Sequence, residues 1–464
     1  MSENSFEKIT FDAWQTAAQK ALRGVSVDSL TKTTYDGIAV KPLYAQSQIS
    51  NQVALPTEAW QINQAINHPN IDQAKKQIAE DLEQGVNALS LHSDQSLAAN
   101  GYGIKINQTN LKSLFKNTYL DMISLRLETG LDEISVAETI LTHSQKHGQL
   151  SLGIDPIGKL AQFGGWDAEP VAKQTVQDAV KQFDATHILR ADGRIAHNAG
   201  ASEAQELAFI ISTALCYLKW ADEANIDLHS TAQKIEICIS ASQNQFITIA
   251  KIRALRQLWA ELLDGLGIQQ SSAYIYAETS YRMLSKSDPW VNLLRATVAC
   301  FSAGIGGVNQ LGILPMSAAI GLAPSFDRRL ARHIQTILIE ESHLAEVTDS
   351  SHGSFYIENL TSDITQKAWE IFQTTQKSNG LIANLLSGNI QQQINSVSKK
   401  REQDYQAEEL CLVGTSEFTN HDEKPYETLK VDRVTVDIPN FKVKITPLTA
   451  KRDAEMFENQ SEDA

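Results

Sequence analysis

The chain has 464 residues, 42% hydrophobic and 20% charged, which is enough to bury a large core without disulfide or metal support. At about 150 residues per domain, this length fits about three domains or one large barrel. Its 40 basic and 55 acidic residues give a net charge of −15. That balance excludes a protein that binds nucleic acid through a basic surface.

The four cysteines are far apart in the sequence and form no CxxC pair, so we expect reduced, buried thiols. Met1 to Lys8 are polar and acidic, whereas a secretory signal needs a basic start and an apolar core. The longest apolar stretches, residues 207–218 and 298–308, fall short of the roughly 18 residues that span a membrane. The sequence therefore predicts a soluble, cytoplasmic protein that does not enter membranes.

The first fifty residues are polar and carry one short amphipathic helix pattern, which begins near Phe11 and ends at Gly24. Residues 34–44 follow as a turn and a short extended piece. We expect an extended N-terminal arm over residues 1–50.

Between residues 51 and 420, short β-rich runs alternate with longer helical ones, as is typical of parallel βαβ units. About eight strands over this length predict an α/β protein with a (β/α)8 TIM barrel. An open doubly wound sheet is the alternative, but no phosphate-binding loop follows the first predicted strand. The predicted strands are 88–91, 150–154, 187–190, 235–240, 273–277 and 410–413, with weaker patterns near Ile123 and over 306–311.

Three helices are indicated by apolar spacing and caps. Ser202 and Gln205 form a capping box before one of them, and residues 246–262 and 326–338 form the other two. The last forty residues turn polar and acidic. We expect a linker-like tail over residues 421–464, solvated from Lys451 to Ala464.

Two sequence features resemble metal sites. His143 and His147 are four residues apart, a spacing that places two imidazoles on one helix face, but histidines in a last helical turn also complement the helix dipole. Asp227-Leu228-His229 matches the start of a DxHxxG cobalamin loop, yet its sixth position is Ala232. We predict no metal site.

The glycines of residues 303–307 have two interpretations. Their backbone N–H groups could cradle a phosphate. Because apolar residues at helical spacing precede them, a helix C-cap that leads into a strand is the better explanation.

Asp155 and His197 each follow a predicted strand, where a barrel has its active site. Asp155 begins an Asp-Pro-Ile-Gly turn, and the turn by itself explains these residue types. His197-Asn198-Ala199-Gly200 could hold a general acid or base, although the sequence assigns it no partner. These two residues are the candidates if the chain is catalytic.

Several longer strings, in their order along the chain, resemble the methylmalonyl-CoA mutase family. The resemblance extends from about Phe11 to Phe457. The strings that carry it are TYDGI at 34–38 with PLY at 42–44, DGR at 192–194 with HNAGA at 197–201, FITIAKIRALRQLW at 246–259, NLLRATVACFSAGIGG at 292–307 and DSSHGSFYIENL at 349–360.

At two positions the sequence departs from the family's catalytic chains. These chains carry Gly-Tyr-His before the shared Ala-Gly-Ala, and their histidine contacts the substrate thioester, whereas this chain has Gly193, Arg194 and Ile195. A second family histidine, after the Gly-Gly pair, is replaced by Gly312. The long aromatic- and arginine-rich stretch, with its active-site tyrosine, has no counterpart between Tyr44 and Gly85.

The resemblance implies that coenzyme A threads along the barrel axis of catalytic chains, which requires small polar side chains inside the barrel. Here Ile235, Ile237 and Ile239 form one alternating face, and Tyr274 and Tyr276 form another. An eight-stranded barrel has room for side chains or a ligand, not both. If those faces point inward, the barrel is filled.

These departures identify the chain as resembling the small, non-catalytic subunit of methylmalonyl-CoA mutase, in a short form without a cobalamin domain. Residues 446–457 resemble the start of the linker to that domain. The resemblance implies a heterodimer with a catalytic large subunit. That partner binds adenosylcobalamin and interconverts (R)-methylmalonyl-CoA and succinyl-CoA by radical chemistry.

We therefore expect no catalytic, cofactor-binding or metal-binding residues in this chain. The alternative is a barrel enzyme, or a subunit of one, that acts on another acyl-CoA at the barrel mouth with Asp155 and His197. An open axial channel lined by Ser and Thr would favour the enzyme, and a packed interior would favour the small subunit.

Overall fold

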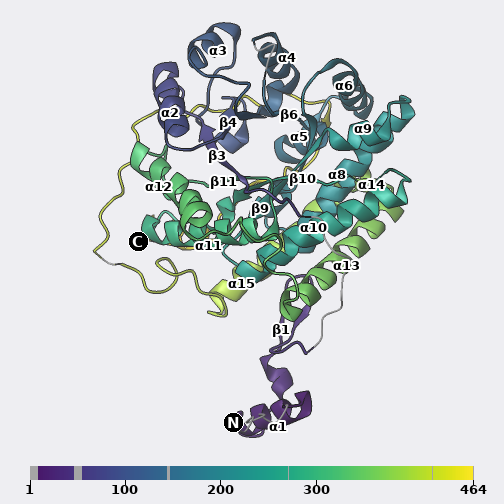
Figure 1. Cartoon of the computed structure of the whole chain (residues 1–464), viewed down its shortest axis with the longest axis vertical. Coiled ribbons are helices and arrows are strands. Elements are labelled where there is room, and N and C mark those ends of the chain that lie inside the picture. The colour runs from purple at the N-terminus through teal and green to yellow at the C-terminus, as the bar shows by residue number, and fades with distance from the viewer. Residues whose placement is uncertain (1–8, 46–54, 144–146, 270, 421, 463–464) are drawn as a thin grey trace, which may run out of the picture.

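In the computed structural model, eight parallel strands close into a barrel surrounded by helices (Figure 1). The structure describes residues 9–45, 55–143, 147–269, 271–420 and 422–462. The predicted (β/α)8 barrel is confirmed, while the predicted domain boundaries at 50/51 and 420/421 each touch residues outside this description. The barrel strands, in their order around the barrel, are β10 (Tyr274–Thr279), β11 (Gln310–Gly312), β3 (Gln61–Ile66), β4 (Ala88–His92), β5 (Ser124–Glu128), β6 (Leu150–Ile154), β8 (His187–Asp192) and β9 (Ile235–Ala241).

Helices connect successive barrel strands, and five helices, α12 to α16, follow the last barrel strand in the chain, β11. Helix α13 packs across α8 and α10 on one side of the barrel (Figure 1). The helices are α1 (Phe11–Ala21), α2 (Ile71–Glu83), α3 (Gln108–Leu114), α4 (Glu133–His143), α5 (Pro156–Phe163), α6 (Glu169–Gln182), α7 (Arg194–Asn198), α8 (Glu203–Glu223), α9 (Leu228–Gln233), α10 (Gln245–Gly265), α11 (Pro289–Gly306), α12 (Ser325–Thr336), α13 (Phe355–Lys377), α14 (Gly380–Leu386), α15 (Asn389–Gln406) and α16 (Glu455–Glu462). Four two-residue strands complete the set: β1 (Lys32–Thr33), β2 (Ala39–Val40), β7 (Gly165–Trp166) and β12 (Val443–Lys444).

The strand predictions are confirmed for most of the barrel and wrong at its two ends. The first strand, β3, was not predicted, because its sequence Gln-Ile-Asn-Gln-Ala-Ile alternates polar residues and so resembles a loop. The predicted strand 410–413 does not form, and Val413 makes only an isolated bridge to Glu417. The barrel is already closed and offers that segment no free strand edge.

The barrel interior is filled by charged and aromatic side chains. Arg126 on β5 donates to both carboxylate oxygens of Glu236 on β9, at 3.2 Å each. Its guanidinium carbon lies 3.5 Å from the ring centroid of Tyr276 on β10, the strand opposite β5 in the barrel order. These contacts cross the barrel axis, so no channel runs through the interior at this level.

The inward face of β9 is the one that carries Glu236 and Cys238. The predicted isoleucine face therefore points outward, where Ile235, Ile237 and Ile239 are buried in the main apolar core. The predicted tyrosine face does point inward, since Tyr276 stacks on Arg126 across the axis. Polar and aromatic side chains, rather than isoleucines, fill the barrel.

The interior charges are paired in an alternating network. Arg190 on β8 donates to Glu236 at 2.7 Å and to Glu128 at 3.1 Å, and Arg126 reaches Glu128 at 2.6 Å. Burial acts to raise the pKa of Glu128, but Arg190, Arg194 and Arg126 together hold it well below its usual range. The carboxylates stay ionised because each has more than one cationic neighbour.

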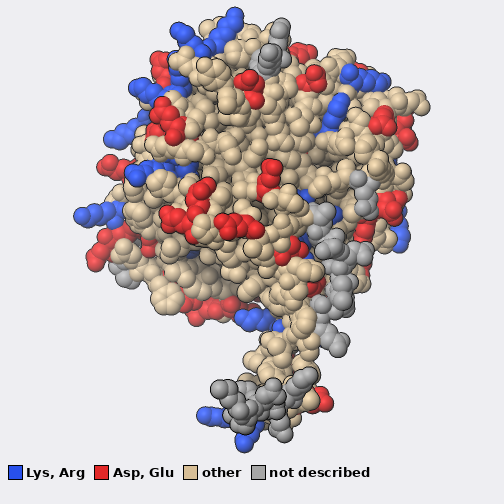
Figure 2. Space-filling model, viewed as in Figure 1, with Lys and Arg blue, Asp and Glu red and all other residues tan. Residues whose placement is uncertain are grey.

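The N-terminal arm is attached to the barrel by the Thr-Tyr-Asp-Gly-Ile motif and projects beyond it (Figures 1 and 2). The carboxylate of Asp36 accepts hydrogen bonds from the Ser202 hydroxyl and, at 3.1 Å, from the Ala204 N–H, so it caps helix α8. Tyr35 donates to Asp404 at 2.7 Å. Outside this attachment, no residue of α1 is buried.

The C-terminal segment is more ordered than its composition predicts. Strand β12 pairs antiparallel with β7. Within residues 451–464, which were expected to be solvated, Ala454 is fully buried and Arg452 forms a 2.6 Å ion pair with Glu458. The prediction of a solvated tail is wrong here because this pairing neutralises the charges that made the segment look solvent-exposed.

None of the helices in the described part of the chain is both long and apolar enough to cross a bilayer.

We expect Arg126→Leu to lower the free energy of unfolding by about 3–5 kcal/mol, because it leaves buried Glu236 with one cationic partner fewer. Lys173→Leu is the matched control. It removes a 2.6 Å ion pair to Glu223 that is largely exposed, and should cost less than about 1 kcal/mol. Urea unfolding of both variants measures the difference. Equal losses would contradict the structural role of the interior network.

Candidate functional site

A pocket at the barrel mouth has a volume of about 390 Å³. It lies at the carboxyl ends of β5, β6, β8 and β10, where (β/α)8 barrels place their active sites. Residues 447–450 of the C-terminal segment form part of its wall. The polar side chains that line it are Ser96, Asn100, Glu128, Thr129, Glu133, Asp155, Lys159, Gln162, Arg190, Asp192, Arg194, Asn198, Glu278, Tyr281 and Thr449.

Asp155 lines this pocket, as the sequence predicts for a residue that follows a strand. It is the N-cap of α5, and its Oδ1 accepts the Gly158 N–H at 2.7 Å and the Tyr217 hydroxyl. Burial raises its pKa to about 7. The second oxygen, Oδ2, has no hydrogen-bond partner among the described residues.

His197 does not line the pocket. It is completely buried, with Nδ1 at 3.2 Å from Glu206 and Nε2 at 2.8 Å from the Ser280 hydroxyl. Burial lowers its pKa to about 3, so the ring is neutral at physiological pH. Glu206 also accepts from Lys251 at 2.6 Å. The structure therefore does not bring the two candidates into one site: His197 links α7, α8 and the end of β10 as a structural residue.

The two positions that depart from the family's catalytic pattern both lie at the mouth. Ile195 lines the 390 Å³ pocket. Gly312 lines a smaller cavity that shares Ala98, Asn100 and Glu278 with the pocket. A Cβ at Gly312 would lie 2.4 Å from the Tyr276 hydroxyl, so no larger residue fits beside this tyrosine. Neither position presents an imidazole to the mouth.

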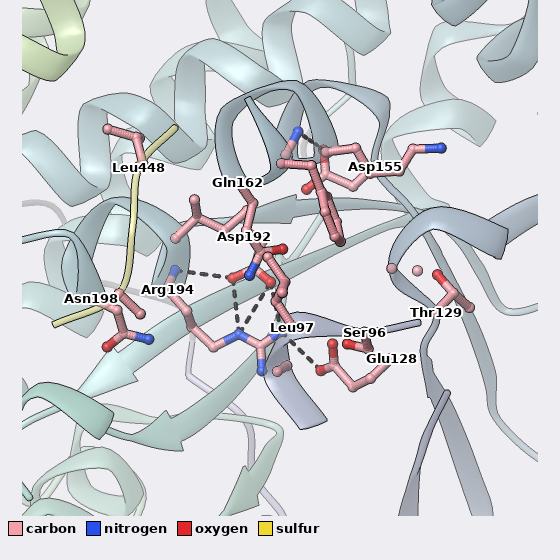
Figure 3. A pocket seen from close by; sticks show the side chains of 18 of the residues that line it. Ser96, Leu97, Glu128, Thr129, Asp155, Gln162, Asp192, Arg194, Asn198 and Leu448 are labelled. Atoms are coloured by element: carbon pink, nitrogen blue, oxygen red, sulfur yellow. Dashed lines mark hydrogen bonds and ion pairs between the residues drawn. The ribbon is translucent and has the colours of Figure 1, made fainter. Parts of the chain in front are cut away.

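Arg194 lines the pocket and pairs there with Asp192 and Glu128 (Figure 3). It lies 2.6 Å from Asp192, 2.9 Å from Glu128 and 3.3 Å from Glu278. Burial acts to lower its pKa, but these three carboxylates hold it well above its usual range. Because its donors are used by the protein, this arginine is not free to bind a substrate carboxylate or phosphate.

The pocket carries an excess of acidic groups. Five carboxyl side chains line it, against two arginines and one lysine. Besides Asp155, Glu278 has its pKa raised by burial. A raised pKa favours the protonated, neutral form of a carboxyl group, so these two groups contribute less negative charge than their number suggests.

The remaining predicted motifs have structural roles. Gly307, with φ at 85°, is the C-cap of α11, which confirms the helix-cap interpretation of residues 303–307. Asp227 caps α9 by accepting the Ser230 N–H at 2.7 Å, and His229 lies beside Gln269 O at 3.3 Å, away from the mouth pocket.

The histidine pair also lies away from the mouth. His143 is the last residue of α4, and His147 Nδ1 lies 3.1 Å from the Gly148 carbonyl oxygen. In the part of the chain that the structure describes, no three His, Cys, Asp or Glu side chains are arranged to hold a metal ion.

Sequence reasoning missed the charged residues of the barrel interior. The signal was present, because Glu236 and Cys238 alternate with the three isoleucines of β9. A charged residue in an otherwise apolar strand indicates a partner on another strand. The partners, Arg126 and Arg190, are 110 and 46 residues away in the chain, so only the fold identifies them.

We expect the stability of the chain to depend on pH through Asp155. Because its pKa rises from 3.8 to about 7 on folding, the native state holds a proton that the unfolded state has lost. The contribution of Asp155 to stability is therefore fully present below about pH 4 and is lost as the pH rises to about 7. Asp155→Asn cannot ionise, so over this range the variant should gain roughly 2–4 kcal/mol relative to the parent.

Thermal or urea unfolding from pH 4 to 8 measures this gain. Asp167→Asn, which changes an exposed carboxylate nearby, is the control and should leave the pH profile unchanged. Parallel profiles for the parent and Asp155→Asn would contradict the shifted pKa.

Comparison of the sequence with known proteins finds similarity over most of the chain. The family model described as methylmalonyl-CoA mutase matches residues 33–462. The chain is 30% identical to the methylmalonyl-CoA mutase small subunit of Streptomyces virginiae, over 91% of this chain and 72% of that protein. Small subunits of Propionibacterium freudenreichii subsp. shermanii and Porphyromonas gingivalis are each 27% identical, over 89% and 98% of this chain and 69% and 77% of theirs. The chain belongs to the methylmalonyl-CoA mutase family.

Proposed function

We propose that this chain is the non-catalytic small subunit of a methylmalonyl-CoA mutase. In this proposal it forms a heterodimer with a catalytic large subunit, which binds adenosylcobalamin and interconverts (R)-methylmalonyl-CoA and succinyl-CoA. The observation that carries the proposal is the filled barrel axis. The names of the similar proteins support the same assignment.

The filled axis argues against binding of an acyl-CoA by this chain. A thioester that threads through the barrel would have to displace Arg126 from the ring of Tyr276 and from Glu236. Each of these side chains is at most 1% exposed. Breaking a buried ion pair costs several kcal/mol, which the binding of a flexible thioester does not readily supply.

The residues at the mouth support the proposal independently. At the position of the substrate-binding histidine of catalytic chains, Ile195 has no group that can donate a hydrogen bond. Arg194 is already paired with Glu128, Asp192 and Glu278, so it offers no free donor to the phosphates of coenzyme A or to the carboxylate of a methylmalonyl group.

The residues of this chain do not fit cobalamin. The one partial cobalt-ligand motif has its aspartate engaged as a helix cap, and His229 lies between Gln269 O and Gln233 rather than at the barrel mouth. We therefore propose that the partner chain binds the cofactor. The proposal also places the complex in the cytoplasm, which the four unpaired cysteines support.

We expect the purified chain to show no mutase turnover with adenosylcobalamin and methylmalonyl-CoA, because it binds neither. Together with its catalytic partner it should elute as one complex with full activity. Size-exclusion chromatography and an assay for succinyl-CoA check both statements. Turnover by the isolated chain, or failure to bind a mutase large subunit from the same source, would overturn the proposal.

The arm supplies a second argument for a partner. Ile9 is 81% exposed and Phe11 is 45% exposed, and α1 contributes no buried residue to this chain. An amphipathic helix held away from its own core is typical of a segment that packs on another chain. We therefore propose that residues 1–50 wrap around the catalytic subunit.

We expect Phe11→Asp to weaken the heterodimer at least tenfold, because it places a charge on the apolar side of α1. The fold should be unaffected, since α1 buries nothing in this chain. Met122→Asp, at a side chain 79% exposed on the barrel, is the control and should leave the affinity unchanged. Titration calorimetry with the catalytic subunit measures both, and equal affinities would exclude the arm from the interface.

One observation favours an alternative function. Asp155 has a pKa of about 7 in a 390 Å³ pocket, which suits a general acid or base. The alternative is a barrel enzyme, or a subunit of one, that acts on another acyl-CoA at the mouth. The alternative predicts that the complex turns over such a substrate and that Asp155→Asn abolishes this turnover. The small-subunit proposal predicts instead that Asp155→Asn leaves the mutase activity of the complex unchanged.

A further inference from the structure

A second cavity lies beside the mouth pocket and is independent of the proposed function. Its volume is about 50 Å³, and it is lined by the ends of β3, β4, β10 and β11 and by the loops of residues 98–102 and 313–323. Since a water molecule needs about 10–15 Å³ of such space, the cavity admits a molecule of several heavy atoms. It shares four lining residues with the 390 Å³ pocket, namely Ala98, Asn100, Glu278 and Leu314, so a ligand could enter from the mouth.

Three buried side chains that line this cavity have polar atoms without a partner among the described residues. They are Asn63 Nδ2, Gln64 Oε1 and both ring nitrogens of His92. The three residues are 1%, 2% and 4% exposed. Asn63 and Gln64 are neighbours on β3 and therefore face opposite sides of the strand, so Asn63 Nδ2 and the His92 ring are the groups on the interior side of the cavity. Buried polar groups are almost always hydrogen-bonded, so these atoms indicate a missing partner.

These atoms are of complementary kinds. Asn63 accepts from Ser90 through Oδ1 at 2.8 Å, which leaves its NH2 group free to donate. Gln64 donates through Nε2 to Arg328 O at 3.3 Å, which leaves Oε1 free to accept. Burial lowers the pKa of His92 to about 4, so its neutral ring has one N–H donor and one bare nitrogen. On its interior side the cavity therefore offers the NH2 donor of Asn63 and the ring of His92, which can donate through one nitrogen and accept through the other.

The charged groups at the cavity are already paired. Glu278 lies 3.3 Å from Arg194 and accepts from the Tyr276 hydroxyl at 3.1 Å. Arg328 is held by Asp81 and donates to Ala65 O at 2.7 Å. Neither leaves an uncompensated charge, so a buried ionic ligand would have no counter-ion.

We propose that this cavity binds a small neutral molecule that carries a primary amide or a similar donor-and-acceptor group. The amide oxygen accepts from the Asn63 NH2 group, and the amide NH2 donates to the bare nitrogen of the His92 ring. Larger ligands of this class extend into the 390 Å³ pocket. No phosphate, carboxylate or metal contact is required.

Three planar molecules of equal size and different charge test this assignment on the full chain. They are acetamide, acetate and acetamidinium, with charges of 0, −1 and +1. Ligand-observed NMR titration should show saturable binding of acetamide with a dissociation constant on the order of millimolar, as befits a ligand of four heavy atoms. Acetate and acetamidinium should bind at least tenfold more weakly.

The ring of His92 reports the site directly in the unmutated protein. Selective ¹⁵N labelling of histidine should show both His92 ring nitrogens shifting as acetamide saturates. His92→Leu should weaken acetamide binding about tenfold or more. His343→Leu, at an exposed surface histidine, should leave it unchanged.

Each other result overturns the proposal. Tighter binding of either ion would show that the cavity selects charge. Saturable binding without a response at His92 would place the ligand elsewhere. Absence of saturation with all three molecules would mean that the cavity holds only water. Because none of these readouts involves the catalytic subunit, their failure is separate from failure of the proposed function.

Discussion

The ion pairs between Arg126, Arg190, Glu128 and Glu236 are the constraint on which the rest of this molecule depends. They join β5, β8 and β9 inside the barrel, where a lone charge would be costly and a paired one is tolerated. Since the guanidinium of Arg126 also lies over Tyr276, the network closes the axis from opposite sides. At the level of these side chains, the barrel has no open central channel.

The ion pairs of the barrel interior continue to the barrel mouth. Arg194 extends the network to the barrel mouth through its ion pair with Glu128. It also pairs with Asp192 and Glu278, so its charge is already compensated by the protein. The smaller cavity lined by Asn63 and His92 lies beside the 390 Å³ pocket and shares Asn100 and Glu278 with it.

The sequence predicted the architecture well because repeated apolar runs and caps are local signals. The Ser202 capping box, the C-cap at Gly307 and the strands near 150 and 235 all depend on neighbours within a few residues. The first barrel strand escaped prediction because its inward side chains are polar. Strand 410–413 was predicted wrongly, since an apolar run cannot reveal that the barrel is already closed.

The candidate site was only half predictable. The sequence by itself determined the family, the barrel and the absence of a histidine at Ile195 and Gly312, because these are matters of residue identity and local pattern. Only the tertiary structure decided that His197 is buried and hydrogen-bonded to Glu206 and Ser280, whereas Asp155 lines a pocket. It also decided which of the two faces of β9 points into the barrel. A strand's period of two defines two faces but not their direction, which is set by partners more than a hundred residues away.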